Sequence, residues 1–105
     1  MSGALRLDKW LWFARFAKSR ADAQKLIERG QVSLNGKVVE KVSANVKVGD
    51  ALAIVTGPTR HSIDVVALGA RRGPAAEAQT LYVRTAPQER LNWEEAAPPL
   101  HRRGF

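Results

Sequence analysis

The apolar residues near the start of the chain recur at intervals of three and four, which is the spacing of an amphipathic helix. Four of them follow this rule and predict a helix over residues 7–17, namely Leu7, Trp10, Leu11 and Ala14. The other side of this segment carries three more aromatic residues, Trp12, Phe13 and Phe16. Because a helix that is apolar nearly all round is usually buried on two sides, we expect these three residues to pack beneath residues 61–85.

A second helix is predicted directly after the first, with clear start and stop signals. Its apolar stripe consists of Ala23, Leu26 and Ile27. Ser19 precedes this stripe and is followed three residues later by Asp22, which resembles the capping box that begins many helices. Gly30 follows the stripe and is the residue type that most often ends a helix in the left-handed conformation.

Short strands are predicted beyond the second helix. The segment VSLNGKVV, residues 32–39, contains Asn35-Gly36, which is the strongest short-range signal of a β-hairpin. Further apolar strand candidates follow at residues 51–55, 61–68 and 81–83. Pro74 is placed to open a short helix between the last two. The pattern predicts an α+β fold, in which two N-terminal helices pack on a small, mainly antiparallel sheet.

The chain has 105 residues, no cysteine and a formal net charge of +7. The lack of cysteine excludes disulfides and thiol chemistry and fits a reducing compartment, so we expect a cytoplasmic protein. The sequence contains neither an apolar run of membrane-spanning length nor the pattern of a signal peptide.

The positive charge is concentrated in the half of the chain with the clearest folding signals. Residues 1–50 hold ten Lys or Arg against five Asp or Glu, whereas residues 51–105 hold seven against five. The charge therefore lies on folded structure rather than on a disordered tail. A basic surface of this kind favours a polyanionic partner, either nucleic acid or an anionic membrane surface.

Three motifs in the basic half together resemble a known RNA-binding domain. The segments RLDKWL (residues 6–11), SRADAQKLIERGQVSLNG (19–36) and VKVGD (46–50) have the order and spacing of the S-four domain, which is named after a protein of the small ribosomal subunit. The opening RLDKWLW and the later RRGPAAEA (71–78) are similar to the fifteen-kilodalton ribosome-associated heat-shock protein family.

This resemblance implies a function and a division of the chain. It implies non-catalytic binding of structured RNA, namely ribosomal RNA of the large subunit, in stress response or quality control, with tRNA on stalled subunits as a further partner. We expect no membrane partner, and any binding to DNA would be non-specific. We expect an N-terminal arm over residues 1–5 and the S-four domain over 6–55. Residues 56–85 would form a strand and a short helix that pack on this domain. Residues 86–105 contain three prolines and no periodicity, so we expect a loosely ordered tail.

In the S-four domain, cations of the helices and the tip of the hairpin share one face. Carried over to this chain, that face predicts these RNA-binding residues: Arg6, Lys9, Arg15, Lys18, Ser19, Arg20, Lys25, Arg29, Asn35 and Lys37. Arg presents a planar fork to phosphate, and backbone N–H groups after Ser19 point toward the same kind of ligand. Asn35 is equally well explained by the positive φ of its turn. Stacking on RNA bases is the alternative to burial for Trp12, Phe13 and Phe16. We expect Arg20, Lys25 and Lys37 to be dispensable for the core.

Catalysis, cofactors and metal binding find little support in the sequence. His61 and His101 are isolated, and Asp8, Asp22 and Asp50 are explained as helix-start or turn residues. We therefore expect no enzyme, no cofactor and no metal site. Three alternatives remain: a general nucleic-acid binder that also accepts DNA, a protein-interaction module that uses the aromatic first helix, and an enzyme without a recognisable motif.

Overall fold

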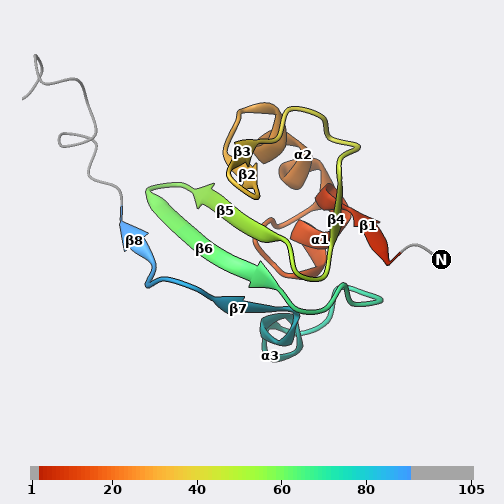
Figure 1. The fold of residues 1–105 in the computed structure, drawn as a ribbon. Coiled ribbons are helices and arrows are strands. Elements are labelled where there is room, and N and C mark those ends of the chain that lie inside the picture. The colour runs from red at the N-terminus through yellow and green to blue at the C-terminus, as the bar shows by residue number, and fades with distance from the viewer. Residues whose placement is uncertain (1–2, 91–105) are drawn as a thin grey trace, which may run out of the picture.

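The computed structural model describes residues 3–90, which form helices and antiparallel strands (Figure 1). The helices are α1 (Leu7–Phe13), α2 (Arg20–Glu28), α3 (Ala75–Ala78) and the short 3-10 helix η1 (Gln79–Leu81). The strands are β1 (Ala4–Arg6), β2 (Val32–Leu34), β3 (Lys37–Val38), β4 (Asn45–Lys47), β5 (Ala51–Thr56), β6 (Thr59–Val65), β7 (Tyr82–Arg84) and β8 (Glu89–Arg90). The predicted α+β class, with two N-terminal helices against an antiparallel sheet, is confirmed.

The strands form two sheets. The larger sheet has the order β3-β2-β5-β6-β7, and β8 pairs with the start of β6 while β7 pairs with its end. The smaller sheet consists of β1 and β4, with Leu5 opposite Val46. The long β5–β6 hairpin therefore links the N-terminal half of the chain to α3 and β7 (Figure 1).

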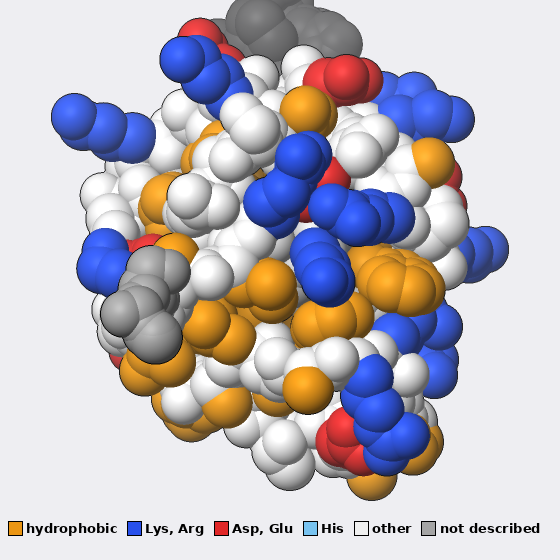
Figure 2. All heavy atoms as spheres, turned by 90° about the vertical axis from the view of Figure 1, so that its right-hand side faces the viewer, with side chains coloured by type: hydrophobic (Ala, Val, Ile, Leu, Met, Phe, Trp, Pro, Cys, Tyr) orange, Lys and Arg blue, Asp and Glu red, His pale blue; other side chains and the backbone are white. Residues whose placement is uncertain are grey.

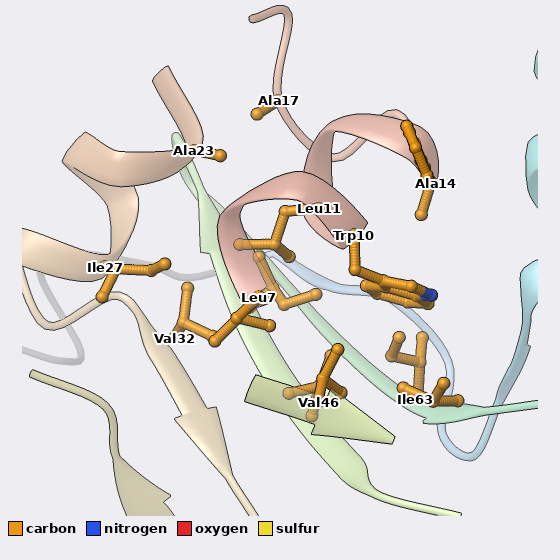
Figure 3. Packing of buried hydrophobic residues seen from close by; sticks show 14 of the residues in the cluster. Leu7, Trp10, Leu11, Ala14, Ala17, Ala23, Ile27, Val32, Val46 and Ile63 are labelled. Carbon is orange, nitrogen blue, oxygen red and sulfur yellow. The ribbon is translucent and has the colours of Figure 1, made fainter. Parts of the chain in front are cut away.

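The hydrophobic core lies between α1, α2 and the strands, and Trp10 is its largest fully buried side chain. Figure 3 shows side chains of α1 meeting Ile27 of α2, Val32 of β2, Val46 of β4 and Ile63 of β6. The indole Nε1 of Trp10 donates a hydrogen bond to the carbonyl oxygen of Ala67 at 2.9 Å. The expectation that Trp10 belongs to the core is confirmed, and its polar atom ties α1 to the segment after β6.

The helix predicted over residues 7–17 is shorter in the structure, because α1 ends at Phe13. Arg15 adopts a left-handed backbone with φ of 65°. Its N–H group donates to the carbonyl oxygen of Trp12, and the N–H group of Phe16 donates to that of Leu11. These are the bonds of a Schellman ending, in which glycine is the usual left-handed residue. This early end is not predictable from the residue type, since Arg15 occupies the position where glycine is usual.

The aromatic residues around the end of α1 pack beneath the later part of the chain, as predicted. Phe13 is buried, and the ring of Phe16 lies 4.9 Å from that of Tyr82 and 5.3 Å from that of His61. Trp12 is partly buried, and the guanidinium of Arg72 lies over its ring at 5.8 Å. These side chains are engaged within the fold.

The other local signals of the N-terminal half are also confirmed. Ser19 Oγ accepts a hydrogen bond from the N–H group of Asp22 at the start of α2. Gly30 follows α2 with φ of 73°, and Asn35 and Gly36 both have positive φ in the β2–β3 turn. Three strands were not predicted, because β1 begins in the expected N-terminal arm, β4 overlaps the VKVGD segment, which reads as a turn, and β8 lies within residues 86–105, where a tail was predicted. Residues 91–105 of that tail lie outside the described residues.

Replacing Trp10 with alanine tests the central place of this residue. We expect the free energy of unfolding to fall by about 3–5 kcal/mol, since the change removes a large buried ring and its hydrogen bond. Val66→Ala is the matched control at an exposed apolar position, and it should change stability by less than about 0.5 kcal/mol. Urea denaturation measures both, and equal losses in the two variants would contradict the packing described above.

Candidate nucleic-acid interface

The carboxylate of Asp8, in the first turn of α1, is fully buried and lies between two of the predicted RNA-binding arginines. Arg6 of β1 binds it with two nitrogens, Nε to Oδ1 at 3.2 Å and Nη2 to Oδ2 at 3.1 Å. Gln24 of α2 donates to Oδ2 at 2.9 Å, and Arg20 at the start of α2 places its Nε 3.5 Å from the same oxygen. One carboxylate thus joins β1, α1 and α2.

These contacts keep Asp8 ionised. Burial raises the pKa of Asp8, but hydrogen bonds from Arg6 and Gln24 and the positive charges of Arg20 and Arg6 outweigh this effect. The pKa of Asp8 therefore lies below its usual value. The negative charge of Asp8 also holds the guanidinium groups of Arg6 and Arg20 near each other, although their like charges repel.

The side chains of both arginines remain partly exposed to solvent. The side chains of Arg6 and Arg20 are 44% and 42% exposed, although the carboxylate between them is 0% exposed. Figure 2, which views the molecule from the β1 and β4 side of Figure 1, shows Lys and Arg side chains gathered at the centre of this face, next to hydrophobic ones. The prediction that Arg20 is dispensable for the core is wrong in one respect, since Arg20 helps to neutralise a buried charge.

A second group of predicted residues lines a hollow of about 300 Å³ beside α2. Lys18, Lys25 and Arg29 border it together with Asp22, and its floor includes apolar atoms of Phe16 and Leu26. Lys18 precedes the cap residue Ser19, whereas Lys25 and Arg29 are exposed near the end of the helix. The hollow therefore has a mostly basic rim over an apolar floor.

Asn35 and Lys37 lie at the tip of the β2–β3 hairpin, and only Asn35 has a side chain bound within the part of the fold that the structure describes. The side-chain amide of Asn35 donates to Asp50 at 3.1 Å and accepts from the N–H group of Ala51 at 2.9 Å. Through these bonds and its positive φ, Asn35 stabilises the β2–β3 turn. Lys37 is exposed in β3. Lys47, on the other side of Asp50, forms an ion pair with it at 3.3 Å.

The remaining two candidates are tied to other parts of the fold. Lys9 lies on α1 with its Nζ 5.6 Å from the centre of the Phe13 ring. Arg15 donates from Nε to the carbonyl oxygen of Gly73 at 2.7 Å and borders a different pocket from the one beside α2. The structure thus joins Arg6 and Arg20 through Asp8, groups Lys18, Lys25 and Arg29 around one hollow, and places Arg15 elsewhere.

Sequence reasoning missed the residues that position these cations. The sequence explains Asp8 only as a helix-start residue and does not single out Gln24. The available signal was a single acidic residue within a basic segment, two positions after Arg6. The sequence also assigns no place to Arg72, which donates to the carbonyl oxygens of Trp12 and Ala17 at 3.1 and 3.4 Å and so stabilises the end of α1.

Comparison with known proteins places this arrangement in a family. The S4 domain, the S-four domain of the sequence analysis, matches residues 5–52. The trimeric structure of heat shock protein 15 from Vibrio cholerae superposes with a TM-score of 0.74 and 40% identity, covering 79% of this chain and 83% of that chain. The chain belongs to the S4-domain family of heat shock protein 15. The predicted S4 type of fold is thereby confirmed.

Two curated relatives extend the comparison. Heat shock protein 15 of Escherichia coli is 44% identical over 82 residues, which is 78% of this chain. The RQC P-site tRNA stabilizing factor of Listeria monocytogenes is 36% identical over 83 residues, which is 77% of this chain and 89% of that protein. The chain spans 61% of the length of the heat shock protein 15 relatives from Escherichia coli and Haemophilus influenzae. No helix in the described part of the chain is long and apolar enough to cross a membrane.

The lowered pKa of Asp8 predicts how stability depends on pH. Because this pKa is lower in the folded protein than in the unfolded one, Asp8 stabilises the fold above about pH 4, and the contribution is lost as pH falls through the folded pKa. Asp50, whose pKa is also lowered, acts in the same direction. We expect Asp8→Asn to lower the free energy of unfolding at neutral pH and to make its decline on acidification shallower.

Urea denaturation of the parent and Asp8→Asn proteins between neutral and acidic pH measures this difference. The two curves should converge at the acidic end, where Asp8 of the parent becomes protonated. Parallel curves with a constant separation would contradict the ionised state assigned to Asp8.

Proposed function

We propose that this protein binds structured RNA without catalysis and that its target is ribosomal RNA of the large subunit. The observation that carries the proposal is the pair of partly exposed arginine side chains, Arg6 and Arg20, held together by the buried carboxylate of Asp8. The relative named as a P-site tRNA stabilizing factor supports a role in ribosome-associated quality control, with tRNA on stalled subunits as a second RNA ligand.

The geometry of the two arginines suits phosphate. Asp8 engages Nε and Nη2 of Arg6 and lies near Nε of Arg20, so the other guanidinium nitrogens are the ones offered to a ligand. A guanidinium that is already oriented loses less conformational freedom when it binds an anion. Arg6 and Arg20, held by Asp8, would therefore bind phosphate groups at one fixed spacing more tightly than they bind a flexible polyanion.

The other cations extend this surface. Lys18, Lys25 and Arg29 around the hollow beside α2, and Lys37 on the hairpin, would add contacts to the RNA backbone. Such contacts do not distinguish one base sequence from another, so selectivity would come from matching the shape of a folded RNA. The apolar floor of the hollow allows contact with a sugar or a base edge between phosphates.

The alternatives named from the sequence receive less support. Trp10 and Phe13 of the aromatic segment are buried in the core, which leaves little of the first helix for a protein partner. Binding to DNA as well as RNA is separated from the proposal by competition. Unlabelled duplex DNA of equal phosphate concentration should displace a labelled large-subunit RNA fragment only weakly.

The salt dependence of RNA binding tests the electrostatic part of the proposal. If about five cations contact phosphates, log affinity should fall against log salt with a slope of roughly −3.5 to −4.5. Fluorescence anisotropy with a large-subunit RNA fragment at several salt concentrations gives this slope. A slope near zero would contradict a phosphate-binding surface.

Single substitutions test whether the surface is specific. Lys25→Ala and Lys37→Ala should each weaken RNA binding and flatten the salt slope by about 0.7–0.9, since each removes one phosphate contact. The melting temperature should hardly change, because both side chains are exposed. Lys47→Ala is the matched control, an exposed lysine engaged with Asp50. Equal weakening by all three would indicate a diffuse polycation instead.

A further inference from the structure

A second pocket, of about 340 Å³, lies between the end of α1, the β5–β6 hairpin, α3 and β7. Its volume falls at the lower end of the range of pockets that hold small organic ligands. Its wall combines aromatic, cationic and hydroxyl groups, the principal ones being Arg15, Phe16, Thr56, His61, Tyr82 and Arg84. It shares no lining residue with the cluster around Asp8, and of the RNA-binding residues predicted from the sequence only Arg15 borders it.

The early end of α1 creates this pocket. The left-handed backbone of Arg15 reverses the chain, so Phe16 leaves the helix and its ring packs against Tyr82 at 4.9 Å. The side chain of Arg15 is then held by its bond to Gly73. A non-glycine residue in this conformation carries strain, which is concentrated in proteins at places where the geometry is needed. The result is two aromatic rings at 48° to each other beside a fixed cation.

The hydrogen-bonding groups of the pocket are arranged as donors. Arg84 can only donate, so its 3.1 Å bond from Nη1 makes Nδ1 of His61 an acceptor. The proton of the neutral ring is then on Nε2, which donates to Thr56 Oγ1 at 2.9 Å. The hydroxyl proton of Thr56 is thereby left to donate to a ligand. Burial and the charge of Arg84 both lower the pKa of His61, which agrees with a neutral ring.

The charge of the pocket also favours a ligand that accepts hydrogen bonds, and in particular an anion. Arg15 and Arg84 are cations, and none of the described residues that line the pocket is acidic. The guanidinium of Arg84 lies 5.6 Å from the centre of the Tyr82 ring, so a positive charge stands next to an aromatic face. A ligand that matches both features is flat, aromatic and anionic.

We propose that this pocket binds a single nucleotide, with the base against Tyr82 and Phe16 and the phosphate near Arg84 and Arg15. The proposal builds on the RNA-binding function above, since an unstacked nucleotide of a bound RNA is one source of this ligand and a free mononucleotide is the other. Bases that leave an RNA helix are commonly held by stacking on aromatic side chains and arginine. The pocket would then hold one nucleotide while the face around Asp8 binds the folded RNA.

Nuclear magnetic resonance titration of the full chain tests the proposal. Adenosine monophosphate and a single-stranded RNA hexamer should each shift the amide signals of Thr56, His61 and Gln79 in a saturable way. The tighter of the two identifies the source of the nucleotide. Inorganic phosphate is the third probe, and equal shifts at equal affinity with phosphate alone would overturn the assignment of a nucleotide site.

Variants locate the ligand within the pocket. Arg84→Ala and Tyr82→Leu should each weaken hexamer binding about fivefold or more, as expected when a phosphate contact or one stacked base is lost. Tyr82→Phe keeps the ring and should bind like the parent, which separates stacking from any effect on folding. Arg71→Ala is the matched control, because Arg71 is an exposed arginine paired with Glu77 at 2.7 Å. Unchanged affinity in both Arg84→Ala and Tyr82→Leu would overturn the proposal.

The proposal of an RNA surface around Asp8 and the proposal of a nucleotide pocket can be contradicted independently of each other. If Arg20→Ala weakens binding to large-subunit RNA while the nucleotides cause no shifts at Thr56, His61 or Gln79, only the pocket proposal is wrong. If adenosine monophosphate shifts these signals while Arg20→Ala binds large-subunit RNA like the parent, the pocket proposal stands and the Asp8 cluster is not the RNA surface.

Discussion

The fold and its basic surface both depend on the buried carboxylate of Asp8. Burying a charge without partners is costly, and breaking a buried ion pair leaves that cost uncompensated. Here Arg6, Arg20, Gln24 and the N–H group of Lys9 surround the carboxylate. Because these groups come from β1, α1 and α2, the interaction fixes how the three elements meet. The bonds that stabilise the buried charge are also the bonds that orient two cations toward solvent.

The large aromatic residues act on the inner side of the same helix. Trp10 fills the centre of the core and binds Ala67, while Phe16 leaves the helix to pack on Tyr82. This packing connects the S4 domain to the segment that contains α3 and β7. The helix α1 therefore supports the charged face through Asp8, and Phe16, directly after its end, forms part of the pocket beside α3 and β7.

Local signals in the sequence were sufficient for the parts of the fold that depend on neighbouring residues. Ser19, Gly30 and Asn35-Gly36 mark a helix start, a helix stop and a hairpin because each acts within a few positions along the chain. The end of α1 could not be predicted in this way, since Arg15 takes a conformation usually reserved for glycine and is held by Gly73, far away in the sequence. The short strand β8 likewise depends on pairing with β6.

The candidate site was predicted only as a set of cations. Sequence and resemblance named Arg6 and Arg20 but did not indicate that both meet at Asp8, because that contact requires the relative placement of β1 and α2. For Asn35, the sequence left a structural and an RNA-binding explanation equally open. Its bonds to Asp50 and Ala51 favour the structural one. The sequence thus predicts helix faces and turns, which depend on residues a few positions apart. It does not predict side-chain networks between distant elements.

The affinity of Asp8→Asn for large-subunit RNA tests the central claim most directly. The substitution removes a negative charge, so a surface that acted only through net charge would bind RNA more tightly. If Asp8 positions Arg6 and Arg20, the variant should instead bind about tenfold more weakly, the loss expected for about 1.4 kcal/mol. Glu28→Gln removes the same charge from an exposed position of α2 and should bind at least as tightly as the parent. Tighter binding by a folded Asp8→Asn protein would contradict the account.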